Sequence, residues 1–100
     1  MKKVSKIKCE NSAGFVQKFK VKWNGGESRW TDTYPNPQSK TIELKSLNIK
    51  EGEELWIEVD AILGKKKTAK EHVVYSQWSD DSALYRTTGA TLTYSIELMN

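Results

Sequence analysis

The chain has 100 residues, the size of one domain that can bury a core without disulfide bonds, and its single cysteine, Cys9, excludes an internal disulfide framework. A net charge of +3 with only two arginines disfavours nucleic-acid binding, since arginine makes most bidentate base contacts. The sequence contains neither a bilayer-spanning apolar run nor a recognisable signal peptide, so we expect one soluble domain over residues 1–100, of unknown localisation.

The first quarter of the chain alternates apolar and polar residues. A first strand is expected at about residues 3–10, and residues 11–14 form the turn after it. In Phe15–Trp23, large apolar residues recur at every second position with lysines between them, which is typical of a strand with one buried face. Asn24-Gly25-Gly26 then predicts a hairpin, because Asn and Gly tolerate positive φ. A third strand over 28–33 therefore returns beside the second.

The middle of the chain is interrupted by two prolines and then resumes the strand pattern. Pro35 and Pro37 each remove a backbone donor and predict an irregular loop. Further strands are expected at 40–44, 55–63 and 72–78, where apolar and β-branched residues alternate with polar ones. The sequence therefore predicts strands on both sides of one loop and no amphipathic helix.

The last quarter of the chain predicts one helical turn and one long strand. Asp and Ser residues at 79–82 would cap a helical turn through 83–85, and strict alternation predicts a strand over 90–98. About seven short strands indicate an all-β fold, an antiparallel β-sandwich of immunoglobulin-like or C2-like shape, with a small closed β-barrel as the alternative. The predicted core consists of the inward apolar residues Ile7, Phe15, Phe19, Val21, Trp23, Ile42, Leu44, Ile57, Val59, Ala61, Val73, Tyr75, Leu92, Tyr94, Ile96 and Leu98.

Charge is unevenly distributed along the chain. Seven lysines and one glutamate precede Trp23, whereas residues 51–60 contain five acidic residues and no basic one. We expect these two segments to be neighbours in a sheet, because opposite charges on paired strands stabilise each other. The lysines of the second strand then serve the fold rather than a ligand.

No combination of residues predicts an enzyme or a cofactor. His72 is the only histidine and has no second histidine or cysteine at metal-ligand spacing, so a solvent-facing role is expected. Cys9 is expected to be a small buried apolar residue rather than a reactive thiol. Four aspartates would make a calcium site if they met at one end of the sandwich, but turn formation explains them better. These aspartates are Asp32, Asp60, Asp80 and Asp81.

The aromatic residues give the main functional hypothesis. Four Trp and four Tyr are more than one small core needs, and several of them lie in predicted loops. Exposed rings provide flat surfaces for sugars and partner chains, so we predict a non-enzymatic module that binds a carbohydrate or a protein surface. The predicted ligand-binding residues are Trp30, Tyr34, Trp78, Asp80 and Tyr85.

Two alternative functions remain open. Outward apolar side chains on otherwise polar strands would form a homo-oligomer interface, which makes a structural or self-assembling module the first alternative. The residues for that interface are Val16, Trp56, Ile62 and Val74. A basic hairpin tip would bind an anionic membrane surface, which is the second alternative. The residues for that surface are Lys65, Lys66, Lys67 and Lys70.

Overall fold

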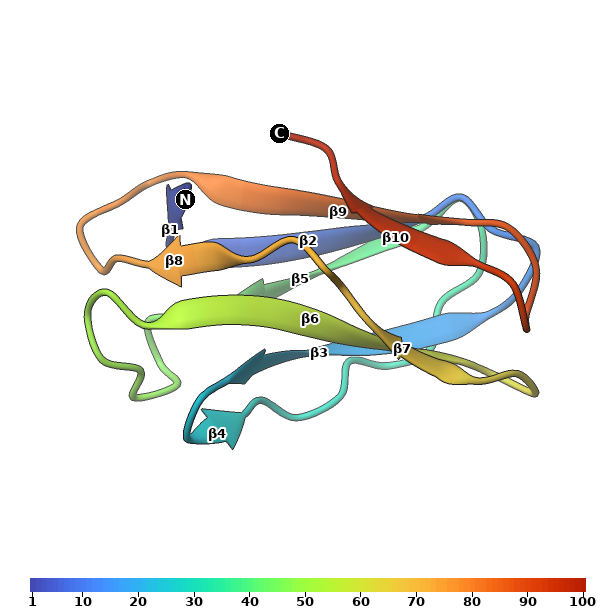
Figure 1. Cartoon of the computed structure of the whole chain (residues 1–100), viewed down its shortest axis with the longest axis horizontal. Helices are drawn as coiled ribbons and strands as arrows, with labels where there is room; N and C mark the ends of the chain where they lie inside the picture. Colours follow the sequence, from blue (N-terminus) through green and yellow to red (C-terminus); the bar gives the residue numbers. More distant parts are fainter.

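The computed structural model describes all residues, 1–100, as two β-sheets packed face to face (Figure 1). One sheet has the strand order β1-β8-β6-β3-β4, with β7 also paired to β6, and the other has the order β10-β9-β2-β5. Both sheets have free edges, so the chain forms the predicted sandwich and not the closed barrel. The strands are β1 (Lys3–Val4), β2 (Lys6–Asn11), β3 (Gln17–Trp23), β4 (Gly26–Glu27), β5 (Ser39–Glu43), β6 (Glu54–Ala61), β7 (Lys66–Thr68), β8 (Val73–Tyr75), β9 (Ser82–Thr88) and β10 (Ser95–Leu98).

Both sheets are mixed, which differs from the fully antiparallel arrangement that the sequence predicts. Strand β1 pairs in parallel with β8, and β2 pairs in parallel with β9 from Lys6↔Ser82 to Asn11↔Thr87. The remaining pairs are antiparallel. Parallel neighbours need a long connection, and about seventy residues separate β2 from β9. Local hairpin signals therefore could not reveal these two pairs. No helix in the structure is long and apolar enough to cross a membrane.

The core lies between the sheets and follows the predicted alternation. Phe19 and Val59 face each other across the β3–β6 pair, as do Val21 and Ile57, and all four are fully buried. The outcome differs for Leu92, which was predicted to point inward and is 62% exposed. Residues 90–94 form a turn, so the predicted strand begins only at β10. The partly buried members of the predicted core are Trp23, Ile42, Ile96 and Leu98.

The predicted helical turn at 83–85 is wrong, because these residues belong to β9. Ala83, Tyr85 and Thr87 are buried and the residues between them are half-buried, which is the two-residue period of a strand. The Ser and Asp residues before Ala83 suggested a helix cap, but the ladder with β2 fixes an extended backbone. Strand β7 was also missed, since its lysines had indicated a turn.

The predicted third strand is regular only at β4. Beyond it, residues 28–31 run along the edge of β3, where Ser28 and Thr31 donate their N–H groups to the carbonyls of Val21 and Phe19. The hydroxyls of the same two residues accept the N–H groups of Val21 and Phe19 at 2.9 and 3.1 Å. The two hydroxyl oxygens thus act as acceptors where a regular strand would use backbone carbonyls. Residues 28–31 therefore lack regular strand geometry, although the backbone groups of Phe19 and Val21 on this edge all have partners.

The expected pairing of basic and acidic segments is present on the outer face of the β3–β6 pair. Lys20 lies opposite Glu58 in register, with Nζ 3.7 Å from a Glu58 carboxylate oxygen and 3.0 Å from Glu27. Lys22 lies 3.7 Å from the same Glu58 oxygen. These lysines therefore hold neighbouring strands together, as the charge distribution predicted.

Candidate functional site

Three turns meet at one end of the sandwich, on the right in Figure 1: residues 12–16, 62–65 and 89–94. We call this the three-turn end. Strand directions place it where β2, β6 and β9 end and where β3, β7 and β10 begin. The opposite end carries the 76–81 turn, and both chain termini lie on that side, since Lys3 pairs with Val74 and Asn100 bonds to Ser82. The two ends therefore offer separate surfaces.

The three turns are in direct contact with one another. The N–H of Ile62 donates to the carbonyl of Val16 at 2.9 Å, and the N–H of Lys65 donates to the carbonyl of Thr91 at 3.4 Å. A Cβ on Gly64 would lie 2.6 Å from the Thr91 carbonyl oxygen, so only glycine fits between these two turns. The three-turn end is therefore one continuous surface rather than three independent loops.

Tyr94 supports this surface from below. Its ring packs edge-on against Phe15 with the centroids 4.9 Å apart, and its hydroxyl lies 3.1 Å from the carbonyl oxygen of Val59 and 2.8 Å from that of Lys65. The ammonium of Lys67 donates to the Tyr94 carbonyl. Burial raises the pKa of Tyr94 to about 12, so the hydroxyl remains a donor at neutral pH. One fully buried tyrosine thus contacts all three turns or their flanking strands.

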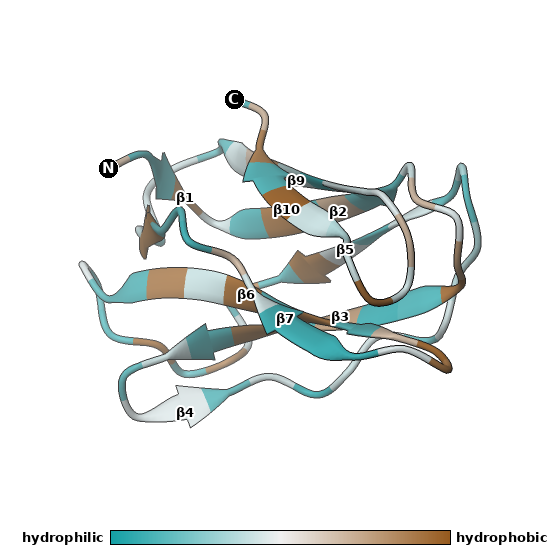
Figure 2. Cartoon of the chain, turned by 45° about the vertical axis from the view of Figure 1, so that its right-hand side comes forward, coloured by the Kyte–Doolittle hydropathy of each residue, from teal (hydrophilic) through white to brown (hydrophobic).

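Three apolar side chains project into solvent at this end. Leu63 is 99% exposed, Leu92 is 62% exposed and Val16 is 41% exposed. We call these residues the apolar tip. Figure 2 shows the hydrophobic colour at the ends of the turns that carry the two leucines. Each residue comes from a different turn, and none of them contributes to the core, so burial on folding does not explain their hydrophobicity.

Leu63 also has an unfavourable backbone conformation. Its φ is +64°, in the left-handed region that β-carbon sterics disfavour for leucine. The other non-glycine residue with positive φ is Asn48, whose side chain tolerates this region. The strained backbone at Leu63 lowers the stability of the fold, and its fully exposed side chain makes no packing contacts that would offset this loss.

The apolar tip is accompanied by positive charge. Lys65 and Lys66 are exposed beside Leu63, and the three turns contain no acidic residue. Of the other two lysines predicted for an anionic surface, Lys67 is half-buried and bonded to Tyr94, whereas Lys70 is exposed beyond β7, away from the tip. The structure therefore places Lys65 at the apolar tip and Lys66 next to it, opposite Asp60 in register and with its ammonium 5.9 Å from the Trp30 ring centre.

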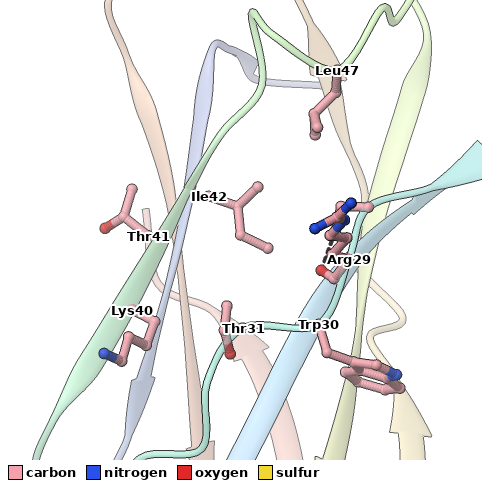
Figure 3. Close-up of a pocket in the computed structure, with 8 residues that line it drawn as sticks. Arg29, Trp30, Thr31, Lys40, Thr41, Ile42 and Leu47 are labelled. Carbon is pink, nitrogen blue, oxygen red and sulfur yellow. Dashed lines mark hydrogen bonds between the residues drawn. The ribbon is translucent and has the colours of Figure 1, made fainter.

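A groove opens between the sheets along one side of the sandwich (Figure 3). It has a volume of about 400 Å³ and is bordered by residues 28–31 on one sheet and by β5 on the other. Ile42 and Leu47 give it an apolar surface, and both pack against the core while remaining partly exposed. Trp30 lines the same groove.

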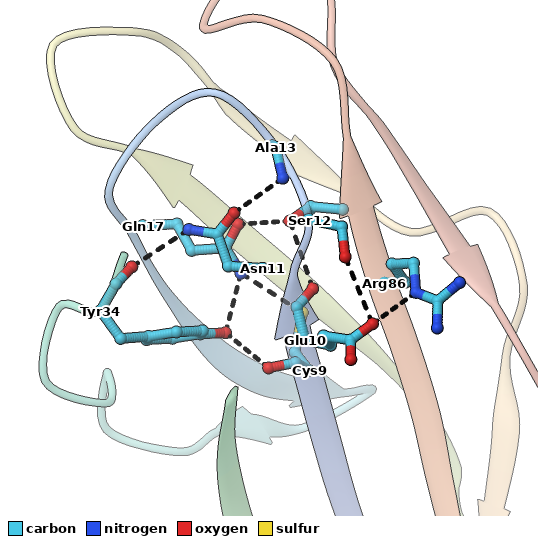
Figure 4. Close-up of polar contacts among 9 residues, drawn as sticks. Cys9, Glu10, Asn11, Ser12, Ala13, Gln17, Tyr34 and Arg86 are labelled. Atoms are coloured by element: carbon cyan, nitrogen blue, oxygen red, sulfur yellow. Dashed lines mark hydrogen bonds and ion pairs between the residues drawn. The ribbon is translucent and has the colours of Figure 1, made fainter. Parts of the chain in front are cut away.

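A buried polar network fixes the base of the 12–16 turn and joins the two sheets (Figure 4). The side-chain amide of Asn11 donates to the carbonyls of Phe15 at 2.7 Å and Tyr34 at 3.1 Å. The Asn11 amide oxygen accepts the N–H of Ala13 at 2.9 Å. Asn11 is fully buried, so it provides partners for three backbone groups that water cannot reach.

The network continues through three further buried side chains, those of Gln17, Tyr34 and Thr87. The amide of Gln17 donates to the Tyr34 hydroxyl at 2.8 Å, and that hydroxyl donates to the carbonyl of Cys9 at 2.9 Å. The hydroxyl of Thr87 donates to the Gln17 amide oxygen. Each of these polar side chains has a partner, as buried polar groups require.

Cys9 is expected to resist thiol reagents until the domain unfolds. Its side chain is fully buried, and burial raises the pKa of the thiol to about 12, so almost no thiolate is present at pH 8. Cys9 should react with Ellman's reagent only as the domain unfolds. The urea concentration at which half of the thiol becomes reactive should therefore equal the midpoint of unfolding measured by tryptophan fluorescence. A fast reaction in the absence of urea would contradict this expectation, and an exposed cysteine introduced at Ser12 serves as the positive control.

Two of the five predicted ligand-binding residues are in the interior, so the expectation that they are exposed is wrong. Tyr34 and Tyr85 are fully buried, and burial raises the pKa of both hydroxyls. The Tyr85 hydroxyl donates to the carbonyl of Glu71 at 2.7 Å. In the sequence, Tyr34 lies beside a proline and Tyr85 follows two aspartates, which predicts loop positions. In the structure each hydroxyl has a buried or partly buried carbonyl partner, so each ring can fill the core.

The other three predicted ligand-binding residues do not form one cluster. Trp30 is half-buried on the outer side of β3, with the ammonium groups of Lys18 and Lys20 at 5.1 and 4.5 Å from its ring centre. Trp78 is 80% exposed at the opposite end from the apolar tip, in the same turn as Asp80. The structure therefore brings only Trp78 and Asp80 near each other.

The four residues predicted for an oligomer interface fall into two separate pairs. Val16 and Ile62 are joined at the three-turn end. Trp56 lies on the outer face of β6, where it stacks on His72 at 4.7 Å, and Val74 lies opposite Glu54 at the start of β6. The length of β6 separates Val74 from Ile62 by roughly 26 Å at about 3.3 Å per residue, so these side chains do not share one surface.

The aspartates also lie at opposite ends. Asp60 is next to the last residue of β6, near the three-turn end, whereas Asp81 lies beside the start of β9, where its backbone carbonyl accepts the N–H of Ser5. No group of three His, Cys, Asp or Glu side chains is close enough to hold a metal ion. No three of the four aspartates therefore come together, as a calcium site built from them would require.

Leu63 and Leu92 were missed because each continued the alternation of a predicted strand. Leu63 is in phase with the buried residues of β6, and Leu92 is in phase with Tyr94. One sequence feature does point to the exposure of Leu63. Gly64 followed by three lysines indicates that the strand ends there, so the apolar residue before them is expected to lie in the turn.

Comparisons with known proteins identify a fold but not a family. No family model and no curated protein matches the sequence. Among solved structures, the chain is similar to listeriolysin O (14% identity, TM-score 0.51), to a structure described as a Gram-negative toxin (19%, 0.52) and to a non-hemolytic pneumolysin from Streptococcus pneumoniae strain ST306 (14%, 0.52). Each match covers 95% of this chain and 22–23% of the toxin chain. The β-rich fold thus occurs as a part of larger toxins.

Proposed function

We propose that this domain binds anionic membrane surfaces through the apolar tip, with Lys65 and Lys66 in contact with lipid headgroups. Full exposure of Leu63 on a strained backbone is the observation that carries the proposal. A leucine in this position is unfavourable in water and becomes favourable once its side chain enters the boundary between headgroups and acyl chains. The similarity to part of three toxin chains concerns the fold, and the proposal rests on these side chains.

The size of the tip determines the expected strength of binding. Burial of one leucine contributes roughly 1.5–3 kcal/mol, and each lysine near an anionic surface contributes about 1 kcal/mol. Two leucines and two lysines are therefore comparable to a single acyl chain, which gives reversible attachment. Several copies of the domain on one particle would bind much more firmly, because each later contact is intramolecular.

Vesicle flotation tests this function directly. The domain is expected to float with phosphatidylcholine vesicles that contain phosphatidylserine and to float less with phosphatidylcholine alone. Substitution of Leu63 and Leu92 together by serine should weaken binding by at least about a hundredfold. Substitution of Lys65 and Lys66 by glutamine should weaken it by about thirtyfold at low salt and remove most of its salt dependence.

Trp78→Ser is the matched control for the leucine variants. Trp78 is also a large exposed apolar residue, but it lies at the opposite end of the sandwich. Its substitution should leave vesicle binding unchanged. The proposal is wrong if Trp78→Ser reduces flotation as much as the two leucine changes do, or if the leucine variants float like the wild type.

A second candidate function is saccharide binding at the Trp78 end. One observation favours it: the 80% exposed ring of Trp78 borders a hollow of about 560 Å³ that also contains Glu51, Asp81 and Lys3. A flat ring beside polar groups suits a sugar, which presents an apolar face and several hydroxyls. On a glycan array, Trp78→Ala should lose any bound glycan, and the leucine variants should retain it.

A further inference from the structure

We propose that the free edge of β5 accepts an extended acidic segment of a partner protein as an additional strand, with alternate side chains of that segment in the groove of Figure 3. This surface is separate from the apolar tip and independent of the proposed function. Strand addition to an open sheet edge takes affinity from main-chain hydrogen bonds and specificity from the pocket beside the edge.

The backbone of β5 has unpaired groups on its outer side. Leu44 donates its N–H to Ser5, and Asn11 donates to the carbonyl of Gln38, so even-numbered residues of this strand turn their backbone groups toward β2. The odd-numbered residues, with Thr41 at the centre, turn theirs away because the period is two. Strand β5 is the last in its sheet, so no other strand meets these groups.

The groove provides an apolar surface next to this edge. Ile42 pairs with buried Ile7 and therefore lies on the inward side of β5, yet it is only half-buried. Leu47 lines the same groove from the connection after β5. Figure 3 shows both apolar side chains pointing into the space between the two sheet edges. An added strand could therefore bury alternate apolar side chains against them while it pairs with Thr41.

The charge of the groove selects an acidic occupant. Arg29 and Lys40 border it from the two opposite edges, and neither forms an ion pair with any acidic residue of the chain. The nearest acidic residue of β5, Glu43, pairs with Lys6 and lies on the outward face. Two unpaired cations beside an open edge complement an extended segment with acidic residues and disfavour a basic one.

Thr41→Pro tests the strand pairing. Proline removes the outward N–H but leaves the ladder with β2 intact, and proline is tolerated on edge strands. The probe is an acetylated and amidated octapeptide with the sequence Val-Thr-Glu-Thr-Val-Thr-Glu-Thr, which presents its valines and glutamates on the same face of an added strand. It should shift the amide NMR signals of Ser39–Glu43 in the wild type, and Thr41→Pro should bind at least about tenfold more weakly. Thr41→Val, which keeps the N–H, should bind like the wild type.

The charge requirement has its own test. Substitution of Arg29 and Lys40 by glutamate should reverse the preference, so that the same octapeptide with lysine in place of both glutamates binds more tightly than the glutamate peptide. Equal binding of both peptides to the wild type would overturn the acidic assignment.

Unchanged affinity in Thr41→Pro would overturn strand addition. A wild-type dimer in sedimentation that Thr41→Pro dissociates would also overturn it, because a second copy would then occupy the edge. Thr41→Pro should still float with anionic vesicles.

Discussion

Replacement of Asn11 by alanine is expected to lower the free energy of unfolding by about 3–5 kcal/mol, the largest effect of any single polar substitution in this domain. Its amide partners the carbonyls of Phe15 and Tyr34 and the N–H of Ala13. Alanine would leave the Phe15 carbonyl and the Ala13 N–H without a partner, whereas the Tyr34 carbonyl would keep only the N–H of Gln17. Each such buried group costs about 1–3 kcal/mol. Urea denaturation followed by tryptophan fluorescence measures the change.

Tyr34→Phe keeps this expectation testable if the alanine variant does not fold, since domains of this size are stable by only about 5–15 kcal/mol. Phenylalanine keeps the ring in place but removes the hydroxyl that bonds to Gln17 and to the Cys9 carbonyl. A loss of about 1–3 kcal/mol is expected. A change of less than about 0.5 kcal/mol in both variants would mean that the network does not stabilise the fold.

Leu63→Asn is expected to make the domain more stable and a weaker membrane binder. Asparagine tolerates positive φ, as Asn48 already does in this chain, so relief of backbone strain should raise the free energy of unfolding by about 0.5–1 kcal/mol. Loss of the leucine side chain should weaken vesicle binding by about ten- to a hundredfold. Urea denaturation and vesicle flotation measure the two changes on the same protein.

Leu92→Asn is the matched control for the two opposite effects expected of Leu63→Asn, a gain in stability and a loss of vesicle binding. Leu92 is also an exposed residue of the apolar tip, but its backbone is not in the left-handed region. Its substitution should weaken vesicle binding without raising stability. If Leu63→Asn lowers stability, or if it raises stability and leaves flotation unchanged, then the strain at Leu63 is not maintained for membrane contact.

The sequence predicted the strands whose side-chain period is local and long enough. Seven alternating residues in β3 and eight in β6 revealed both strands and their buried faces. Strand β9 was hidden because its neighbours in the sheet are distant in sequence and its first residues resemble a helix cap. Alternation also continued through residues 90–94, so it could not indicate where strand pairing stops.

The sites were harder to predict than the fold, because exposure depends on contacts between distant segments. Tyr34 resembles a loop aromatic until Gln17 and Cys9 are seen to bond its hydroxyl. Leu63 resembles the last core residue of a strand until the turn rotates it into solvent. The lysines beside it were recognisable from the sequence, since a run of like charge needs no tertiary contact to be noticed.

The position of the two chain termini determines the orientation of anything attached to the domain. Both lie on the side away from the three-turn end, and the longest dimension of the molecule is 35 Å. A domain docked by its apolar tip would act as a rigid spacer and hold a fused protein a few tens of ångströms above the lipid. Several such spacers side by side would present their attached chains in a common layer parallel to the bilayer.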